Sequence, residues 1–342
     1  MGANTEMRVG LVLGGGGAVG LAYHAGALAA LEHELQWDPR AADVIVGTSA
    51  GAMVAALLRR GLSAGDLAAV AVERQPLSMP REVEAALRER PAFDPVGAHR
   101  WLLRRPRLPS VSVLGRLAMR PWTFDLAHAL ASVLPNGPID ITNGGGRLDE
   151  LFGSTWPADD LHLCVVRQSD LRRVVFGRAD DAAVWQAVAA SCAIPGYFQP
   201  VEIGGATYLD GGVRSPTNAD VLLDRPLDLV IVISPMSARR VGRYGYRSVV
   251  RRHAQSRLLR ERRLLAETGV PSVAVEPGDS VTALAGLNFM SDRNVRAIVQ
   301  ATYFDTADYL ATSDARIALA PLNSRTQRRL DLSGPSIRAV SS

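Results

Sequence analysis

The stretch VGLVLGGGGAVGLAYHAG, Val9–Gly26, places a short apolar run before four consecutive glycines. The run Val9–Leu13 is typical of a buried strand, and residues from about Leu21 to Leu35 predict a helix. Glycines between a strand and a helix let backbone N–H groups approach a negatively charged group. The stretch therefore suits either a bound phosphate or the oxyanion of an acyl-transfer reaction.

The order strand, loop, helix occurs a second time at VIVGTSAGAM, Val44–Met53. A strand is predicted over 43–46, and a helix from Ala50 to Arg59. Two such units in succession indicate a parallel sheet, and hence an α/β fold. Five more segments have the composition of strands: 161–166, 174–176, 207–209, 229–233 and 272–275.

Composition along the chain predicts one domain over 8–320. Its core motifs occupy 9–221, and a proline-interrupted helical insertion is expected over about 76–138. A C-terminal extension is expected over 224–320, and a flexible tail over 321–342.

The overall composition is that of a globular protein, with 342 residues of which 47% are hydrophobic. All 38 basic residues are arginine, but 34 acidic residues leave a net charge of only +4, too small to indicate a nucleic-acid partner. Cys164 and Cys192 are the only cysteines, which fits a reducing compartment. Because no apolar run reaches the length of a membrane span, we expect a cytoplasmic protein whose membrane contacts are peripheral.

The motif G-x-S-x-G is formed by Gly47, Ser49 and Gly51 between a predicted strand and a predicted helix. This is the context of a nucleophile elbow, where small flanking residues permit a sharp turn and the helix N-terminus favours developing negative charge. The alternative is that Ser49 only caps the helix.

The end of the second strand decides how the opening glycines are interpreted. A dinucleotide site would require an acidic residue there to bind ribose, but Asp38 and Asp43 precede or begin that strand. The glycine loop is therefore predicted to supply N–H donors to an oxyanion. The candidate donors are Gly15, Gly16 and Gly17.

Acyl transfer by a serine also requires a general base, in addition to the nucleophile and the oxyanion donors. The order Ser49, Asp210, His253 matches an α/β-hydrolase triad, but His253 lies among arginines that disfavour an imidazolium. Asp210 ends a predicted strand in YLDGG and is the better candidate, although on local sequence a turn aspartate fits equally well.

Taken together, the glycine loop, G-x-S-x-G and D-G-G resemble the patatin-like phospholipase family, over roughly Arg8–Val221. The segment ASCAIPGYFQPVEIGGATYLDGG, Ala190–Gly212, strengthens the resemblance. It implies a three-layer α/β/α sandwich, a dyad of Ser49 and Asp210, and a lipid ester as substrate, with no metal or other cofactor. The motif glycines that it implies are Gly15, Gly16, Gly17, Gly20, Gly47, Gly51, Gly211 and Gly212.

One position departs from that pattern, because members commonly carry Arg or Lys where this chain has Val19. A backbone oxyanion hole does not need that cation. Val19 and the Arg-rich helix predicted over 239–267 also suggest an alternative, a non-catalytic lipid-binding regulator. That helix is expected either to pack on the sheet or to contact an anionic membrane.

Overall fold

The computed structural model describes residues 7–72, 108–119, 126–142, 145–240, 246–286 and 288–312, together with 314, 315, 317–319 and 322. The first part of the predicted insertion, 76–107, and the predicted tail beyond Leu322 lie outside the described residues. The division of the chain into core, insertion and extension therefore stays a prediction.

The described residues form one mostly parallel sheet in the order β5-β6-β3-β2-β1-β7-β8, with β4 also paired to β3. Strands β3, β2, β1, β7 and β8 are parallel neighbours, whereas β4 and β6 run antiparallel to β3. The strands are β1 (Val9–Leu13), β2 (Val44–Thr48), β3 (Asp160–Arg167), β4 (Arg172–Phe176), β5 (Val201–Ile203), β6 (Ala206–Asp210), β7 (Leu229–Ile233) and β8 (Ser272–Val275).

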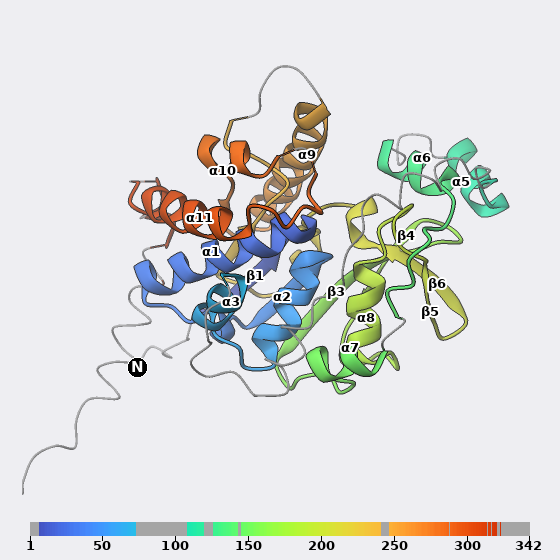
Figure 1. The fold of residues 1–342 in the computed structure, drawn as a ribbon, viewed down its shortest axis with the longest axis horizontal. Coiled ribbons are helices and arrows are strands. Elements are labelled where there is room, and N and C mark those ends of the chain that lie inside the picture. Colours follow the sequence, from blue (N-terminus) through green and yellow to red (C-terminus); the bar gives the residue numbers. More distant parts are fainter. Residues whose placement is uncertain are drawn as a thin grey trace, which may run out of the picture.

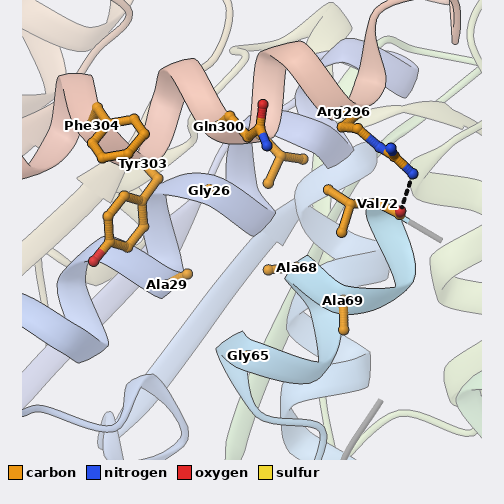
Figure 2. Close-up of a pocket in the computed structure, with 11 residues that line it drawn as sticks. Gly26, Ala29, Gly65, Ala68, Ala69, Val72, Arg296, Gln300, Tyr303 and Phe304 are labelled. Atoms are coloured by element: carbon orange, nitrogen blue, oxygen red, sulfur yellow. Dashed lines mark hydrogen bonds between the residues drawn. The ribbon is translucent and has the colours of Figure 1, made fainter. Parts of the chain in front are cut away.

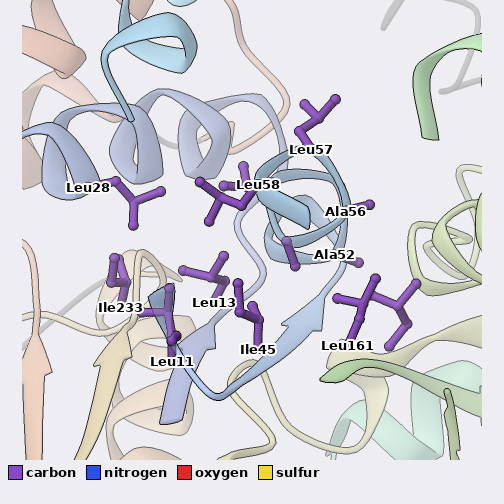
Figure 3. Close-up of a cluster of buried hydrophobic side chains, with 14 of the residues drawn as sticks. Leu11, Leu13, Leu28, Ile45, Ala52, Ala56, Leu57, Leu58, Leu161 and Ile233 are labelled. Carbon is purple, nitrogen blue, oxygen red and sulfur yellow. The ribbon is translucent and has the colours of Figure 1, made fainter. Parts of the chain in front are cut away.

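Helices cover both faces of this sheet. Successive strand residues point to opposite faces, and the strands β1, β2 and β7 are buried along their whole length, so each face has apolar side chains to cover. Leu11, Leu13 and Ile45 face α1 (Gly17–Leu35) and α2 (Ala50–Arg59), as Figure 3 shows. Val12 and Val46 face the other side, where Leu258 and Leu265 of α9 (Tyr246–Glu267) are fully buried. The expected three-layer α/β/α sandwich is confirmed.

The remaining helices extend these two layers (Figure 1). Next to α1 lie α3 (Ala64–Ala71) and α11 (Val295–Leu310), and α7 (Gly145–Phe152) contacts α8 (Val184–Ser191). A short helix α10 (Asp279–Leu284) precedes α11, while α5 (Val111–Met119) and α6 (Leu126–Val133) lie at the β4 end of the molecule.

Most predicted elements are present, with two informative differences at their boundaries. Helix α1 begins at Gly17, four residues before the expected start, inside the glycine run itself. Strand β2 continues through Gly47 to Thr48, because these residues pair with Leu163 and Cys164 of β3. The loop before α1 is therefore short, and a single residue separates β2 from α2.

Helix α9 lies on the sheet as a surface helix with an apolar inner face. Ala254, Leu258 and Leu265 are at most 1% exposed. This confirms that the Arg-rich segment packs its apolar side against the core. Among the described residues, no helix combines the length and the apolar character needed to cross a membrane.

Candidate active site

The pairing of β3 brings the ends of β2 and β6 together. Strand β4 pairs with one side of β3, along Leu163–Arg167. On the opposite side of β3, the part up to Cys164 pairs with β2, and Val165–Arg167 pair with β6. Strands β2 and β6 therefore lie along the same side of β3 and meet end to end. Thr48 is opposite Cys164, and Asp210 is opposite the next residue, Val165.

Ser49 forms the turn between β2 and α2 in a strained backbone conformation, with φ 54° and ψ −122°. Its carbonyl accepts the N–H of Ala52 at 2.8 Å, which starts the helix. The flanking glycines are required sterically. A Cβ on Gly47 would lie 2.6 Å from the Ala52 Cα, and one on Gly51 would lie 2.0 Å from the Leu13 carbonyl oxygen.

Asp210 ends β6 as a buried carboxylate, with 5% of its surface exposed. Burial raises its pKa to about 6, although the nearby Ser49 side chain and the hydrogen bond from the Gly212 N–H act in the opposite direction. The Gly212 N–H lies 2.7 Å from Oδ1. Gly211 has to lack a side chain, because a Cβ there would be 2.3 Å from the Cys164 carbonyl oxygen.

A segment at the end of α8 holds both candidate residues, and sequence reasoning did not identify this role. The Ser191 hydroxyl accepts the Ser49 N–H at 2.9 Å and donates to the Cys164 carbonyl at 2.7 Å. The Ala193 carbonyl accepts the Asp210 N–H at 3.0 Å. Burial holds the pKa of the Cys192 thiol well above its ordinary value.

No histidine hydrogen-bonds Ser49 within the described residues. His253 lies in α9, the helix that packs on the sheet face. His24 is fully buried beneath the glycine loop, where its Nε2–H donates to the Gly14 carbonyl at 2.7 Å. Burial lowers the pKa of His24 to about 4, so this side chain is a neutral support for the loop.

The glycine loop lies beside the elbow, since a Cβ on Gly15 would be 3.4 Å from the Ser49 Cβ. The Gly15 N–H already donates to the Pro216 carbonyl at 2.8 Å. Gly17 has φ +58° and no room for a side chain. Gly20 of α1 faces Ala50, because a Cβ on Gly20 would lie 3.4 Å from the Ala50 Cβ. Of the three candidate donors, Gly16 and Gly17 are the ones whose N–H groups have no hydrogen-bond acceptor among the described residues.

The departure at Val19 has a structural explanation. Val19 is 3% exposed and packs with Ala22, Ala285 and Ile298 between α1 and the C-terminal helices. Its N–H donates to the Phe289 carbonyl at 3.0 Å. An apolar side chain fits this position, because it is buried in contact with other apolar side chains.

A separate groove of about 410 Å³ lies between α1, α3 and α11 (Figure 2). Small residues such as Gly26 and Ala68 line it, and Arg296 bonds the Val72 carbonyl at its edge. None of its lining residues belongs to the elbow, the glycine loop or Asp210. Within the described part of the chain, no three His, Cys, Asp or Glu side chains gather in a way suited to a metal ion.

Comparison with known proteins gives a family match over the region that carries this site. The family model described as patatin-like phospholipase matches residues 11–223. The uncharacterized protein YqhO of Bacillus subtilis (strain 168) is 31% identical over 217 residues, which are 60% of this chain and 63% of that protein. The match thus spans less than two thirds of the relative's length.

Two solved structures share part of the arrangement at low similarity. The crystal structure of VipD from Legionella pneumophila has a TM-score of 0.43 and 13% identity, covering 96% of this chain and 76% of that one. The type III effector protein ExoU has a TM-score of 0.36 and 20% identity, covering 95% of this chain and 53% of that one.

Proposed function

The chain belongs to the patatin-like phospholipase family, and from this membership we propose that it is a serine lipid acyl hydrolase with Ser49 as nucleophile and Asp210 as general base. The observation that carries the proposal is that the ends of β2 and β6 place Ser49 beside the buried Asp210 carboxylate, whose pKa the Ser49 side chain lowers against the effect of burial. A base within hydrogen-bond reach of a serine is the arrangement that activates it. A pKa near 6 makes Asp210 a stronger base than an ordinary aspartate, yet leaves it ionised at neutral pH.

In the first half of the proposed reaction, Ser49 Oγ attacks the ester carbonyl carbon while its proton passes to Asp210. The tetrahedral oxyanion then collapses and the C–O bond to the alcohol breaks. The leaving alcohol takes the proton from Asp210, and an acyl-Ser49 remains. In the second half, water attacks the acyl carbon, gives a proton to Asp210 and releases the fatty acid, and the proton returns to Ser49 Oγ.

The oxyanion in both halves requires fixed N–H donors. The N–H groups of Gly16 and Gly17 are the donors that we propose, because the Gly15 N–H is bonded to Pro216. Gly17 is also in the first turn of α1, whose N–H groups lack partners within the helix and favour negative charge. Removal of one such donor typically costs about a hundredfold or more in rate.

The substrate that we propose is a lipid ester, reached by transient contact with an anionic membrane surface. The outward side of α9 supports this contact, because Arg252, Arg260 and Arg263 are exposed beside Leu259, which is 50% exposed. On this proposal the protein is cytoplasmic and peripheral to the membrane.

The assignment of Ser49 and Asp210 is tested by activity-based labelling and ester turnover. We expect a fluorophosphonate to label the wild-type protein but not Ser49→Ala, and turnover of a p-nitrophenyl ester to fall at least about a thousandfold in Ser49→Ala and Asp210→Asn. His253→Ala is the matched control and should retain turnover within about twofold. Loss of turnover in His253→Ala with retention in Asp210→Asn would instead support a Ser-His-Asp hydrolase.

The non-catalytic regulator is separated from the enzyme by a vesicle assay. Anionic phosphatidylglycerol vesicles are incubated with the wild-type protein and with Ser49→Ala, and both binding and fatty-acid release are measured. We expect both proteins to bind and only the wild type to release fatty acid. Binding without release by the wild type, across esters of different chain length, would favour the regulator.

A further inference from the structure

The segment Ser215–Ala219 lies between the two halves of the candidate active site and belongs to neither of its motifs. It follows the short helix η4 (Gly211–Val213) that begins after Asp210. Its Pro216 carbonyl accepts the Gly15 N–H, which connects it to the glycine loop. Its Asn218 side chain reaches both the elbow strand and the aspartate loop.

Asn218 is fully buried and has the left-handed conformation, with φ 56° and ψ 31°. Its Nδ2 donates to Thr48 Oγ1 at 3.1 Å and to the Ser215 carbonyl at 2.6 Å, with the Gly211 carbonyl at 3.4 Å. Thr48 directly precedes Ser49, and Gly211 directly follows Asp210. One amide group therefore contacts the residue next to each proposed catalytic residue.

We propose that Asn218 is a positioning residue that fixes the distance between Ser49 and Asp210 by holding Thr48 and Gly211 in one hydrogen-bond network. The inference rests on the proposed function of Ser49 and Asp210, and it adds a residue that acts on their geometry. Strands β2 and β6 pair with β3 but not with each other. A link across their ends holds the two proposed catalytic residues beside each other.

Asn218 is itself held from two directions. On the α9 side, the buried Glu261 carboxylate accepts Thr217 Oγ1–H at 2.6 Å and the Ala219 N–H at 2.9 Å, so both neighbours of Asn218 are fixed. On the β4 side, Arg173 Nη1 donates to Asn218 Oδ1 at 3.2 Å and forms an ion pair with Asp220. A rigid support of this kind is what a positioning side chain requires.

The chemistry of the contacts distinguishes asparagine from other residues at this position. A glycine would satisfy the left-handed backbone at no steric cost. An aspartate has a similar shape but no N–H to donate to Thr48 or Ser215. Of these three residues, only asparagine both donates to Thr48 and accepts from Arg173, so the backbone requirement and the hydrogen-bond requirement can be separated by substitution.

The test compares Asn218→Gly, which keeps the backbone conformation and removes the amide, with Asn218→Asp, which keeps the shape and removes the donor. Gln36→Gly is the matched control, because Gln36 also has a positive φ, of 50°, but lies at the far end of α1. We measure kcat and KM for p-nitrophenyl butyrate and the rate of fluorophosphonate labelling. Both Asn218 variants should lose about 10- to 100-fold in kcat and labelling rate with KM within about threefold, and Gln36→Gly should match the wild type.

A second route reaches the same contact from the other side, in case Asn218→Gly does not fold. Thr48→Val removes the hydroxyl that Asn218 holds and preserves the shape of the side chain. It should also lower kcat, and its effect should be much less than additive with that of Asn218→Asp, because the two residues act through one contact.

The outcomes separate the inference from the function on which it rests. If the wild type is labelled at Ser49 but Asn218→Gly and Thr48→Val keep its kcat and labelling rate, the positioning role is overturned and the proposed function stands. A fall in thermal stability without a fall in kcat also overturns the positioning role, since the residue is then only structural. If the wild type is not labelled at Ser49 and turns over no ester, both proposals are overturned.

Discussion

The strand-to-helix turns after β1 and β2 have the same topology but are built from different residues and present different chemical groups. After β1, three glycines precede α1, and the turn presents backbone N–H groups. After β2, Ser49 alone precedes α2, and the turn presents one hydroxyl on a strained residue. Both turns lie at the carboxyl ends of neighbouring parallel strands, where α/β proteins place their sites.

The two turns differ in which of their backbone N–H groups already donate a hydrogen bond within the protein. At the elbow, the Ser49 N–H is bonded to Ser191, and the Ser49 side chain lies close enough to Asp210 to lower the pKa of that carboxylate. In the glycine loop, the Gly15 N–H is bonded to Pro216, while no acceptor for Gly16 or Gly17 exists among the described residues. The same local fold thus yields a nucleophile whose N–H is already bonded in one turn and available N–H donors in the other.

The steric requirement at the two turns gives the largest expected difference in stability. Gly51→Ala places a Cβ 2.0 Å from the Leu13 carbonyl oxygen, so α2 and β1 have to separate. Gly15→Ala places a Cβ at an ordinary 3.4 Å from the Ser49 Cβ. We expect Gly51→Ala to lower the free energy of unfolding by about 3 kcal/mol or more and Gly15→Ala by less than about 1 kcal/mol, measured by urea denaturation. Equal losses would show that the two turns tolerate added volume alike.

The bounds of several strands and of one helix next to these turns can be predicted from the sequence. Strands β1, β7 and β8 and helix α2 have the predicted bounds, because long apolar runs and glycine or arginine stops are local signals. The predicted start of α1 is four residues late, since glycines disfavour helix yet Gly17 begins it. Strand β5 is absent from the prediction, because three residues carry too little pattern.

The site itself is predictable only where a motif marks it. Ser49 and Asp210 stand in recognisable motifs, and the structure brings them together, although their catalytic roles stay a prediction. Ser191 and Asn218 have no such signal, because their partners Ser49 and Thr48 are 142 and 170 residues away. The fit of Val19 likewise depends on α10 and α11, which are distant in sequence.

The elbow lies beside a buried carboxylate, Asp210 at the end of β6, and this predicts a pH-dependent change in stability. Since burial raises the pKa of Asp210 from an ordinary 3.8 to about 6, the folded state favours the protonated form. Its contribution to stability is full below pH 3.8 and is lost as the pH rises through 6. Asp210→Asn should therefore be more stable than the wild type at pH 8, by on the order of 2–3 kcal/mol, and similar to it at about pH 3.5.

The measurement is chemical denaturation at about pH 3.5, 6 and 8, which brackets the shifted pKa of Asp210. Asp228→Asn is the control, because the Asp228 side chain is 47% exposed and should show no such gain. A wild type that is as stable as Asp210→Asn at the highest pH would mean that the contacts of Asp210 with Ser49 and Gly212 fully offset the cost of burying the charge.

The smallest effect concerns the backbone amide in each turn. The acceptor of the Gly15 N–H is a main-chain carbonyl, which no side-chain substitution removes, whereas the acceptor of the Ser49 N–H is the Ser191 hydroxyl. Ser191→Ala leaves that N–H and the Cys164 carbonyl buried without this partner, and should cost about 1–2 kcal/mol in unfolding free energy. Ser256→Ala, on the exposed side of α9, should cost less than about 0.5 kcal/mol. If Ser191→Ala is as stable as Ser256→Ala, the strained elbow is held by β2 and α2 alone, and the contrast with the glycine loop reduces to the hydroxyl of Ser49.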